Sequence, residues 1–142
     1  MVDTVSRQKR SSMMSGIKSV DTKPEIIVRK HLHALGIRFR LRRKIEGVKP
    51  DVVIPKWRAC IFVHGCFWHR HTNCKLASSP KSNIEFWNNK FLKNIERDRR
   101  NIETLMSEDW RVGVIWECSV RSKKFKEFDI ISMLENQQYW EI

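Results

Sequence analysis

The first half of the chain carries the hydrophobic pattern of one helix followed by strands. Residues 22–35 repeat apolar side chains at helical spacing behind a Thr-Lys-Pro-Glu start, and Gly36 is typical of the residue that ends such a helix. Residues 37–41 alternate apolar and basic side chains, which predicts a half-exposed strand with its cations outward. Residues 51–54 and 59–63 lie on either side of a Pro-Lys turn and predict two adjacent buried strands. We expect the helix to pack on the sheet that these strands form.

The second half of the chain predicts a long loop, a long helix, a strand and a closing helix. Residues 64–83 contain Gly, Pro, Ser, His and Cys without periodicity. A loop of this length usually has a function or is held in place by a cross-link such as a metal ion. Residues 84–106 have helical spacing, residues 110–116 predict a further buried strand, and residues 125–139 predict an amphipathic helix. Residues 1–20 are polar and basic without a sustained apolar period, so we expect an arm that contacts a partner.

Composition limits the number of domains and the kind of partner. A chain of 142 residues is long enough for one hydrophobic core, so we expect a single domain at 21–142 behind the arm. The 28 Lys and Arg exceed the 16 Asp and Glu and give a net charge of +12, which makes nucleic acid the first candidate partner. No apolar run approaches the roughly 20 residues of a membrane span. We therefore expect a cytoplasmic, nucleoid-associated protein that makes no membrane contact and keeps its four cysteines reduced.

Three of these cysteines and one histidine have the spacing of a metal site. Cys66, His71 and Cys74 lie close together in the long loop, and Cys118 follows the last predicted strand. A set of three thiolates and one imidazole is typical of zinc, and four protein ligands leave no position for water, which predicts a structural ion. The alternative is that some of them are ordinary buried thiols, as we expect for Cys60 inside an apolar strand.

One aspartate stands directly before a buried strand. Asp51 follows Pro50 and would present a carboxylate at the start of residues 52–54, where Mg²⁺ prefers oxygen ligands. This arrangement is similar to that of restriction-endonuclease-like nucleases, although their second motif, Asp/Glu-x-Lys, is here replaced by Phe62-Val63-His64. An aspartate in this place is also a common turn residue or cap.

Histidines and aromatic residues follow in the long loop. His64, His69 and His71 bracket Phe67 and Trp68. Imidazoles serve as general bases, transition-state cations or metal ligands near neutral pH, and the alternative is a loop of exposed histidines. Two large aromatic rings in a polar loop must be buried or must stack, and in a basic protein the bases of a nucleic acid are the obvious surface.

Two further acids have both a structural and a functional interpretation. Asp98 falls inside the apolar stripe of helix 84–106, which Asn94 borders. A buried aspartate needs a partner, so Asp98 either orients a catalytic histidine or pairs with an arginine, and the helix alone leaves both open. Glu25 forms a capping box with Thr22, and the residues alone favour a cap.

Residues 62–71, Phe-Val-His-Gly-Cys-Phe-Trp-His-Arg-His, resemble the signature of the very-short-patch repair (Vsr) mismatch endonucleases. The resemblance extends in order over about residues 11–120. Its supporting matches are Asp21-Thr22 with Glu25, Lys49-Pro50-Asp51, Glu85-Phe86-Trp87, Asn94-x-Glu96-Arg97-Asp98-Arg99-Arg100, Trp110-Arg111-Val112 and Trp116-Glu117-Cys118.

The resemblance implies a fold and an activity. The fold would be α/β, a restriction-endonuclease-like core in which helices flank a central mixed β-sheet, with one structural Zn²⁺. The activity would be that of a DNA endonuclease using one or two Mg²⁺, which nicks one strand of duplex DNA 5′ to the thymine of a T·G mismatch and starts very-short-patch repair. We expect a monomer, with mismatch-repair proteins as candidate partners.

The resemblance also implies roles for the acids near the first strands. Asp51 would be the main Mg²⁺ ligand, helped by the backbone carbonyl of Val63. Val63 stands where the best-known member of the family has a threonine, but a carbonyl ligand tolerates that change. Glu25 would hold a water of the metal, which reverses the interpretation of Glu25 as a cap alone.

Histidines and DNA contacts follow from the same resemblance. His69 would activate the attacking water with Asp98 behind it, and His64 would assist at the scissile phosphate. The residues expected to contact DNA are Met14, Phe67, Trp68, His69, Lys90 and Asn94.

Two other functions remain open at this point. The first is a restriction- or defence-type nuclease of the same fold with another DNA specificity, because the residues that read the mismatch follow rules that the sequence does not state. The second is a zinc-stapled DNA-binding module without catalysis. The presence of Asp51, His64, His69 and Asp98 argues against the module, since binding alone needs no buried acid beside histidines.

Overall fold

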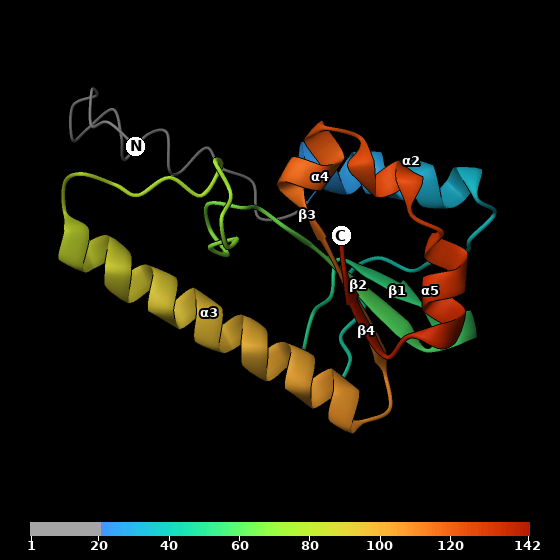
Figure 1. The fold of residues 1–142 in the computed structure, drawn as a ribbon. Coiled ribbons are helices and arrows are strands. Elements are labelled where there is room, and N and C mark those ends of the chain that lie inside the picture. The colour runs from blue at the N-terminus through green and yellow to red at the C-terminus, as the bar shows by residue number, and fades with distance from the viewer. Residues whose placement is uncertain (1–20) are drawn as a thin grey trace.

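The protein folds around a four-stranded mixed β-sheet with helices on both faces (Figure 1). The structure is a computed structural model that describes residues 21–142, so the predicted arm at 1–20, with Met14, lies outside the described residues. The strands, in spatial order, are β1 (Val52–Ile54), β2 (Ala59–His64), β3 (Arg111–Trp116) and β4 (Tyr139–Glu141). β1 is antiparallel to β2, whereas β2, β3 and β4 are parallel, which confirms the predicted α/β class with a mixed sheet.

Helices cover the two faces of the sheet unequally. α2 and α4 lie together on one side with α5, and the long α3 lies on the other (Figure 1). Within residues 21–142, no helix is both long and apolar enough to cross a membrane. The helices are α2 (Lys23–Ala34), α3 (Ile84–Ser107), α4 (Glu117–Arg121) and α5 (Ile130–Asn136), with short 3₁₀ turns at Pro55–Trp57 and Lys124–Glu127.

The strands contribute to a core on each face. Val52 and Ile61 pack in a cluster with residues of α2 and α5, while Val53 and Phe62 pack in a second cluster with Leu105 of α3. Neighbouring residues of a strand point to opposite faces, so a sheet covered on both sides needs apolar residues at every position. This requirement explains why the strands appear in the sequence as continuous apolar runs. Cys60 is fully buried in the second cluster, as predicted for a core thiol.

The first predicted helix is confirmed, with the ends that its sequence indicates. The side chain of Thr22 caps α2 by accepting the backbone N–H of Glu25 (Nitrogen to Oγ1, 3.4 Å), and Pro24 lies in the first turn. Gly36 follows the helix with φ of +78°, a conformation that L-residues with side chains adopt at a cost.

Residues 37–41 do not form the predicted strand. Arg40 pairs with the sheet through one antiparallel bridge to Val53, with backbone N···O distances of 2.7 and 2.9 Å. β1 is only three residues long, and Arg42 turns the chain with φ of +55°. Residues 37–41 do alternate apolar and basic side chains, but β1, the strand beside them, is too short to form more than this one bridge.

The predicted helix at 125–139 is also wrong. The chain there forms a 3₁₀ turn, the short α5 and then β4. Phe128 is extended, and the carboxylate of Asp129 starts α5 by accepting the backbone N–H of Ser132 at 3.1 Å. The helix then ends because Trp140 is buried in the core cluster that contains residues of α2 and α5. In that place Trp140 belongs to β4, which pairs with β3. The preceding α4 was not predicted.

A glycine makes room for this tryptophan. Gly113 of β3 pairs with Trp140 of β4, whose side chain is 4% exposed. A Cβ atom at Gly113 would lie 2.2 Å from Cζ2 of Trp140, far inside van der Waals contact. The indole therefore covers the backbone of β3 directly.

We expect Gly113→Ala to lower the free energy of unfolding by about 1–3 kcal/mol, because the added methyl group overpacks the contact with Trp140. Urea denaturation of the two proteins measures this difference. Gly65→Ala is the matched control, since a Cβ there meets Trp68 Cδ1 at an ordinary 3.7 Å. Adding Trp140→Leu to Gly113→Ala should remove part of the penalty, and strictly additive losses would contradict the proposed clash.

Candidate active site and metal centre

A cleft of about 980 Å³ opens beside the edge of the sheet at which β2 and β3 end. Its walls come from the start of α2, the long loop after β2, and α3. Every residue of 21–142 that was predicted to be catalytic or to contact DNA lines this cleft, although these residues are far apart in the sequence. They are Glu25, Asp51, Val63, His64, Phe67, Trp68, His69, Lys90, Asn94 and Asp98.

Asp51 enters the cleft because β1 and β2 are antiparallel. The residue precedes β1, and its Oδ2 atom accepts the backbone N–H of Val63 at 2.7 Å. Burial raises the pKa of Asp51 to about 7, the bond from Val63 opposes this rise, and the negative charge of Glu25 adds to it. The negative charge of Glu25 therefore makes Asp51 harder to ionise.

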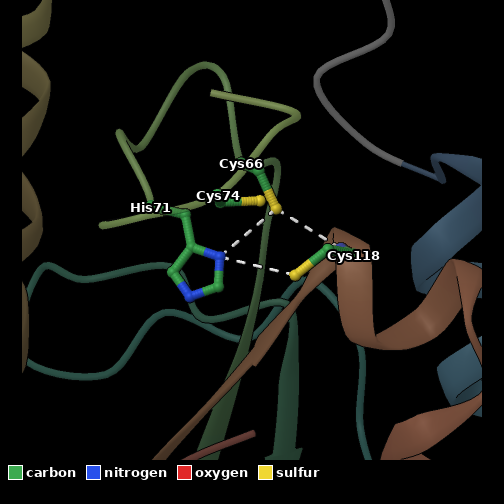
Figure 2. Close-up of side chains that lie close together, drawn as sticks. All are labelled: Cys66, His71, Cys74 and Cys118. Carbon is green, nitrogen blue, oxygen red and sulfur yellow. Dashed lines mark hydrogen bonds between the residues drawn. The ribbon is translucent and has the colours of Figure 1, made fainter. Parts of the chain in front are cut away.

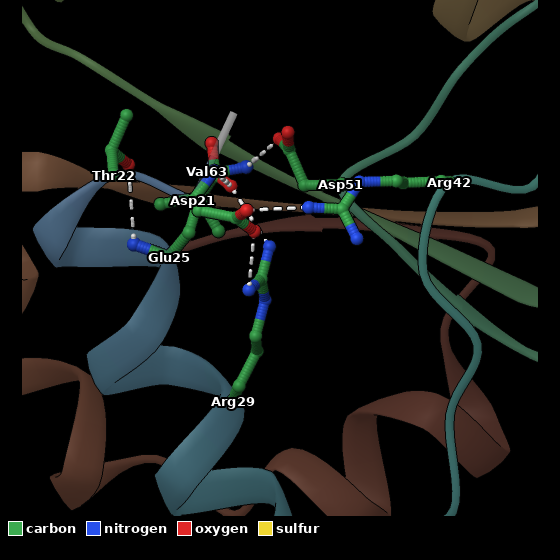
Figure 3. Close-up of polar contacts among 7 residues, drawn as sticks. All are labelled: Asp21, Thr22, Glu25, Arg29, Arg42, Asp51 and Val63. Atoms are coloured by element: carbon green, nitrogen blue, oxygen red, sulfur yellow. Dashed lines mark hydrogen bonds and ion pairs between the residues drawn. The ribbon is translucent and has the colours of Figure 1, made fainter. Parts of the chain in front are cut away.

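Glu25 makes contacts at the start of α2 and also lines the cleft. Its side chain is buried, and Oε2 accepts the backbone N–H of Asp21 at 3.0 Å and a guanidinium N–H of Arg29 at 3.1 Å (Figure 3). The carboxylate thus satisfies a donor near the helix start, as a capping residue does, while it also lines the cleft with Asp51.

The donor set around Asp51 suits a divalent cation. The two carboxylates lie beside the backbone of Val63, and the charge of Glu25 is one of the causes that raise the pKa of Asp51; such oxygen ligands suit Mg²⁺ or a similar hard ion. Asp51, Glu25 and Val63 are consequently the residues that could hold such an ion.

The histidines form a second part of the cleft. The Nδ1 atom of His69 lies 2.5 Å from Oδ2 of Asp98, and the rings of His64 and His69 stack with centroids 3.9 Å apart and planes 5° apart. When Nδ1 of His69 donates its proton to the carboxylate, Nε2 is the basic nitrogen. Of the two interpretations of Asp98, the contact with histidine is the one observed, and no arginine of residues 21–142 forms an ion pair with this carboxylate.

His64 is held as a neutral ring. Its side chain is 5% exposed, and it packs edge-on against Trp116 at a centroid distance of 5.2 Å. Burial lowers the pKa of His64 to about 3, and the neighbouring His69 contributes to the same direction. His64 therefore carries no charge at neutral pH, whereas His69 is the imidazole placed against a carboxylate.

The aromatic pair of the loop rests on the N-terminal half of α3. Phe67 makes edge contacts with Trp87 and Phe91, at centroid distances of 5.6 and 5.3 Å. The backbone carbonyl of Trp68 accepts from Nδ2 of Asn94 at 3.1 Å. This part of α3 extends past the sheet and supports the loop (Figure 1). Both aromatic side chains are partly buried and still line the cleft.

Lys90 belongs to the same wall of the cleft. Its ammonium group lies 5.8 Å from the ring centroid of Trp68. Lys90 and Asn94, both predicted to contact DNA, are therefore neighbours of an aromatic residue with the same predicted role.

Cys66, His71, Cys74 and Cys118 form a compact cluster (Figure 2). One ligand atom from each lies within 4.8 Å of the others. Nδ1 of His71 is 3.6 Å from the sulfur of Cys66 and 3.4 Å from that of Cys118. Bonds of about 2.0–2.3 Å to a tetrahedral ion would place ligand atoms roughly 3.3–3.8 Å apart, so the spacing fits such an ion. The alternative of unrelated buried thiols does not explain this convergence.

The cluster ties the long loop to the end of β3. The backbone N–H of Cys118 donates to the sulfur of Cys66 at 3.3 Å, and the ring of His71 stacks on Trp116 with centroids 4.1 Å apart. Glu117 strengthens this junction, because its Oε1 accepts the backbone N–H of Cys66 at 3.3 Å. The loop that carries Phe67 and the adjacent residues is thereby fixed over the cleft.

Several charged residues of the cleft lie outside the predicted set of site residues. Lys49, Arg97 and Arg121 line it, and Arg121 pairs with Glu117 at 2.8 Å. Lys49 is two residues from Asp51 and Arg97 is next to Asp98, both within motifs that match the family, so their positions were an available signal. Arg121 lies in the indistinct C-terminal part and had none.

Comparisons with known proteins agree with this geometry. The sequence model of a family described as DNA mismatch endonuclease Vsr matches residues 2–76. The type II nicking enzyme V.XorIIP of Xanthomonas oryzae pv. oryzae is 43% identical over 84% of this chain and 88% of its own length. The DNA mismatch endonuclease Vsr of Escherichia coli K12 is 40% identical over 87% of this chain and 79% of its own length.

A solved structure supports the fold. The catalytic domain of the homing endonuclease I-Bth0305I superimposes with a TM-score of 0.56 and 21% identity, over 83% of this chain and 98% of that domain. At this identity the similarity concerns the architecture alone, a mixed sheet flanked by helices. Together with the family match and the identities to the two enzymes, it leads to one assignment: the chain belongs to the Vsr family of DNA mismatch endonucleases.

Proposed function

We propose that this protein nicks one strand of duplex DNA 5′ to the thymine of a T·G mismatch in an Mg²⁺-dependent reaction, and so starts very-short-patch repair. The observation that carries the proposal is the single cleft in which an acid pair, a histidine bound to Asp98 and aromatic side chains meet. Residues 21–142 would be the endonuclease domain, acting as a monomer, and residues 1–20 the arm that contacts DNA.

In this proposal the acids and histidines divide the chemistry. Asp51 and the carbonyl of Val63 would hold Mg²⁺ and Glu25 would hold one of its waters; when bound, the ion supplies positive charge to the phosphate oxygens. Nε2 of His69 takes a proton from the attacking water while Asp98 holds Nδ1 and stabilises the imidazolium.

The attack breaks the bond between phosphorus and the 3′ oxygen. The products are a 5′ phosphate on the thymine and, after the departing 3′ oxygen has taken a proton from solvent water, a 3′ hydroxyl on the preceding nucleotide. His64, held neutral by burial, can donate a hydrogen bond to the phosphate without competing with His69 for the proton.

The aromatic side chains of the cleft support a mismatched duplex as the substrate. Phe67 and Trp68 line the cleft beside Lys90 and Asn94. A mismatched base step costs less to open than a paired one, so rings that enter the stack favour a mismatch. The net charge of +12 supports binding to the duplex backbone.

We further propose that the ion of the cysteine cluster is one structural Zn²⁺. Three sulfur atoms and one imidazole nitrogen are ligands that suit zinc rather than Mg²⁺, and they leave no open position for a substrate. The ion would hold the loop of Phe67 and Trp68 against β3.

The substrate is tested by strand cleavage of end-labelled duplexes that contain a central T·G mismatch or a matched T·A pair, with Mg²⁺ or EDTA. We expect nicking 5′ to the mismatched thymine, dependent on Mg²⁺ and lost in Asp51→Ala, while Asp51→Ala still binds the duplex. Glu135→Ala, which removes an exposed carboxylate on α5, is the control. Equal cutting of both duplexes would favour a restriction-type nuclease, and tight binding without cutting would favour a DNA-binding module.

The role of Asp98 is tested on the same mismatched duplex in single-turnover kinetics. Asp98→Asn keeps the shape of the side chain but no longer stabilises a protonated His69, so we expect the nicking rate to fall by about 10²–10⁴-fold with DNA affinity retained. Glu96→Gln, an exposed acid on the same helix, should leave the rate unchanged. An unaltered rate in Asp98→Asn would contradict the proposed role of Asp98 behind His69.

Metal analysis of the purified protein tests the zinc site. We expect one zinc per chain, and Cys118→Ser should lose it together with several degrees of melting temperature, because the ion contributes to folding. Cys60→Ala is the matched control, since that thiol is buried away from the cluster and its loss should leave the zinc content intact. Full zinc occupancy in Cys118→Ser would place the ion elsewhere.

A further inference from the structure

Arg29 joins two acids at the start of α2 (Figure 3). Its guanidinium donates through Nη2 to Glu25 Oε2 at 3.1 Å and through Nη1 to Asp21 Oδ1 at 2.8 Å. The Arg29 side chain is 17% exposed, and that of Glu25 is 6% exposed. A planar guanidinium can donate to two carboxylates at the same time and fix the direction of each hydrogen bond, which the compact ammonium group of a lysine does not do.

Asp21 holds the other end of this arrangement. Its backbone N–H donates to Glu25 Oε2 at 3.0 Å, and its carboxylate pairs with both Arg29 and Arg42. The bond from Arg29 is the largest of the causes that lower the pKa of Asp21, so this acid is ionised at neutral pH. Asp21 adopts a φ of +55°, an uncommon conformation for a residue with a side chain, and the two arginines stabilise it there.

The same guanidinium affects the acid pair of the cleft. Glu25 is buried beside Asp51, and two ionised carboxylates in such a place repel one another unless a positive charge accompanies them. The charge of Arg29 favours the ionised form of Asp51, and Arg29 also pairs directly with Glu25. Arg29 therefore supplies a positive charge to the pair while its geometry fixes the side chain of Glu25.

We propose that Arg29, itself held by Asp21, is a positioning residue that fixes the carboxylate of Glu25 for a divalent cation shared with Asp51. This inference rests on the cation site of the proposed function. Residues that orient ligands in this way typically change metal affinity by about 10–100-fold when they are lost.

Charge and position have opposite effects on the cation, which makes the inference testable. If Arg29 acted through its charge alone, removing it would leave a more negative site and strengthen cation binding. If Arg29 acts by holding Glu25, removing it weakens cation binding. A purely structural role would lower the melting temperature and leave the affinity for the cation unchanged.

The experiment measures binding of Mn²⁺ to the protein with its duplex, from the electron paramagnetic resonance signal of free Mn²⁺, and separately the Mg²⁺ concentration for half-maximal nicking. We expect Arg29→Gln to weaken Mn²⁺ binding by about 10–100-fold. Arg29→Lys keeps the charge but loses the two-armed geometry, so it should also weaken binding, by a smaller factor. Lys30→Gln removes an exposed charge from the next position of α2 and should change neither value by more than about twofold.

Asp21→Asn provides a variant outside the helix in case Arg29→Gln does not fold, which the melting temperature shows. It keeps Arg29 and loosens it, so Mn²⁺ binding should again weaken. Unchanged or tighter binding in the folded Arg29 variants, or no Mn²⁺ binding by the unmodified protein, would overturn the inference. Mn²⁺ binding without nicking beside a T·G mismatch would instead reject the proposed substrate and leave the role of Arg29 supported or refuted by the binding data.

Discussion

The parallel pairing of β2 with β3 is the constraint on which the site depends. Its register places His64 beside Trp116, so the two segments that continue from these residues leave the sheet next to each other. Cys66 and Cys118, which are 52 positions apart in the sequence, meet there through a backbone N–H and a sulfur. The cysteine cluster, the supported aromatic loop and the histidines of the cleft all follow from this one pairing.

The cleft joins two electrostatic requirements that oppose each other. The proposed cation site needs acids, and the cleft holds the buried Glu25 and the half-buried Asp51, but acids repel the phosphates of DNA. Lysine and arginine side chains on the surrounding walls offset that repulsion without entering the acid pair. The basic composition of the whole chain therefore accompanies a locally acidic centre, and Arg29 of α2 pairs directly with one of its acids, Glu25.

The sequence predicted local elements well and their long-range partners poorly. Caps defined α2, and continuous apolar runs defined β1 and β2, because a sheet covered on both faces leaves that signature. Residues 37–41 alternate as a strand does, yet the length of the neighbouring edge decided the outcome. The residues near Trp140 became a strand because Gly113, far away in the sequence, accommodates the indole. The sequence did not decide the partner of Asp98, because the contact with His69 depends on how the long loop packs against α3. In contrast, Glu25 and Arg29 are one helical turn apart, so their spacing was a usable signal for the ion pair.

The order of the strands also matters while the chain is being made. Synthesis begins at the N-terminus, so α2, β1 and β2 emerge well before β3, and the edge of β2 that β3 covers has no partner in the interval. Glu25, Asp51 and His64 are already present in such a nascent chain. His69 has no contact with Asp98 until α3 has been made, and the loop has no contact with Cys118 until translation has passed that residue. An unfinished polypeptide thus cannot assemble the site, because the contacts that complete it join segments from both halves of the chain.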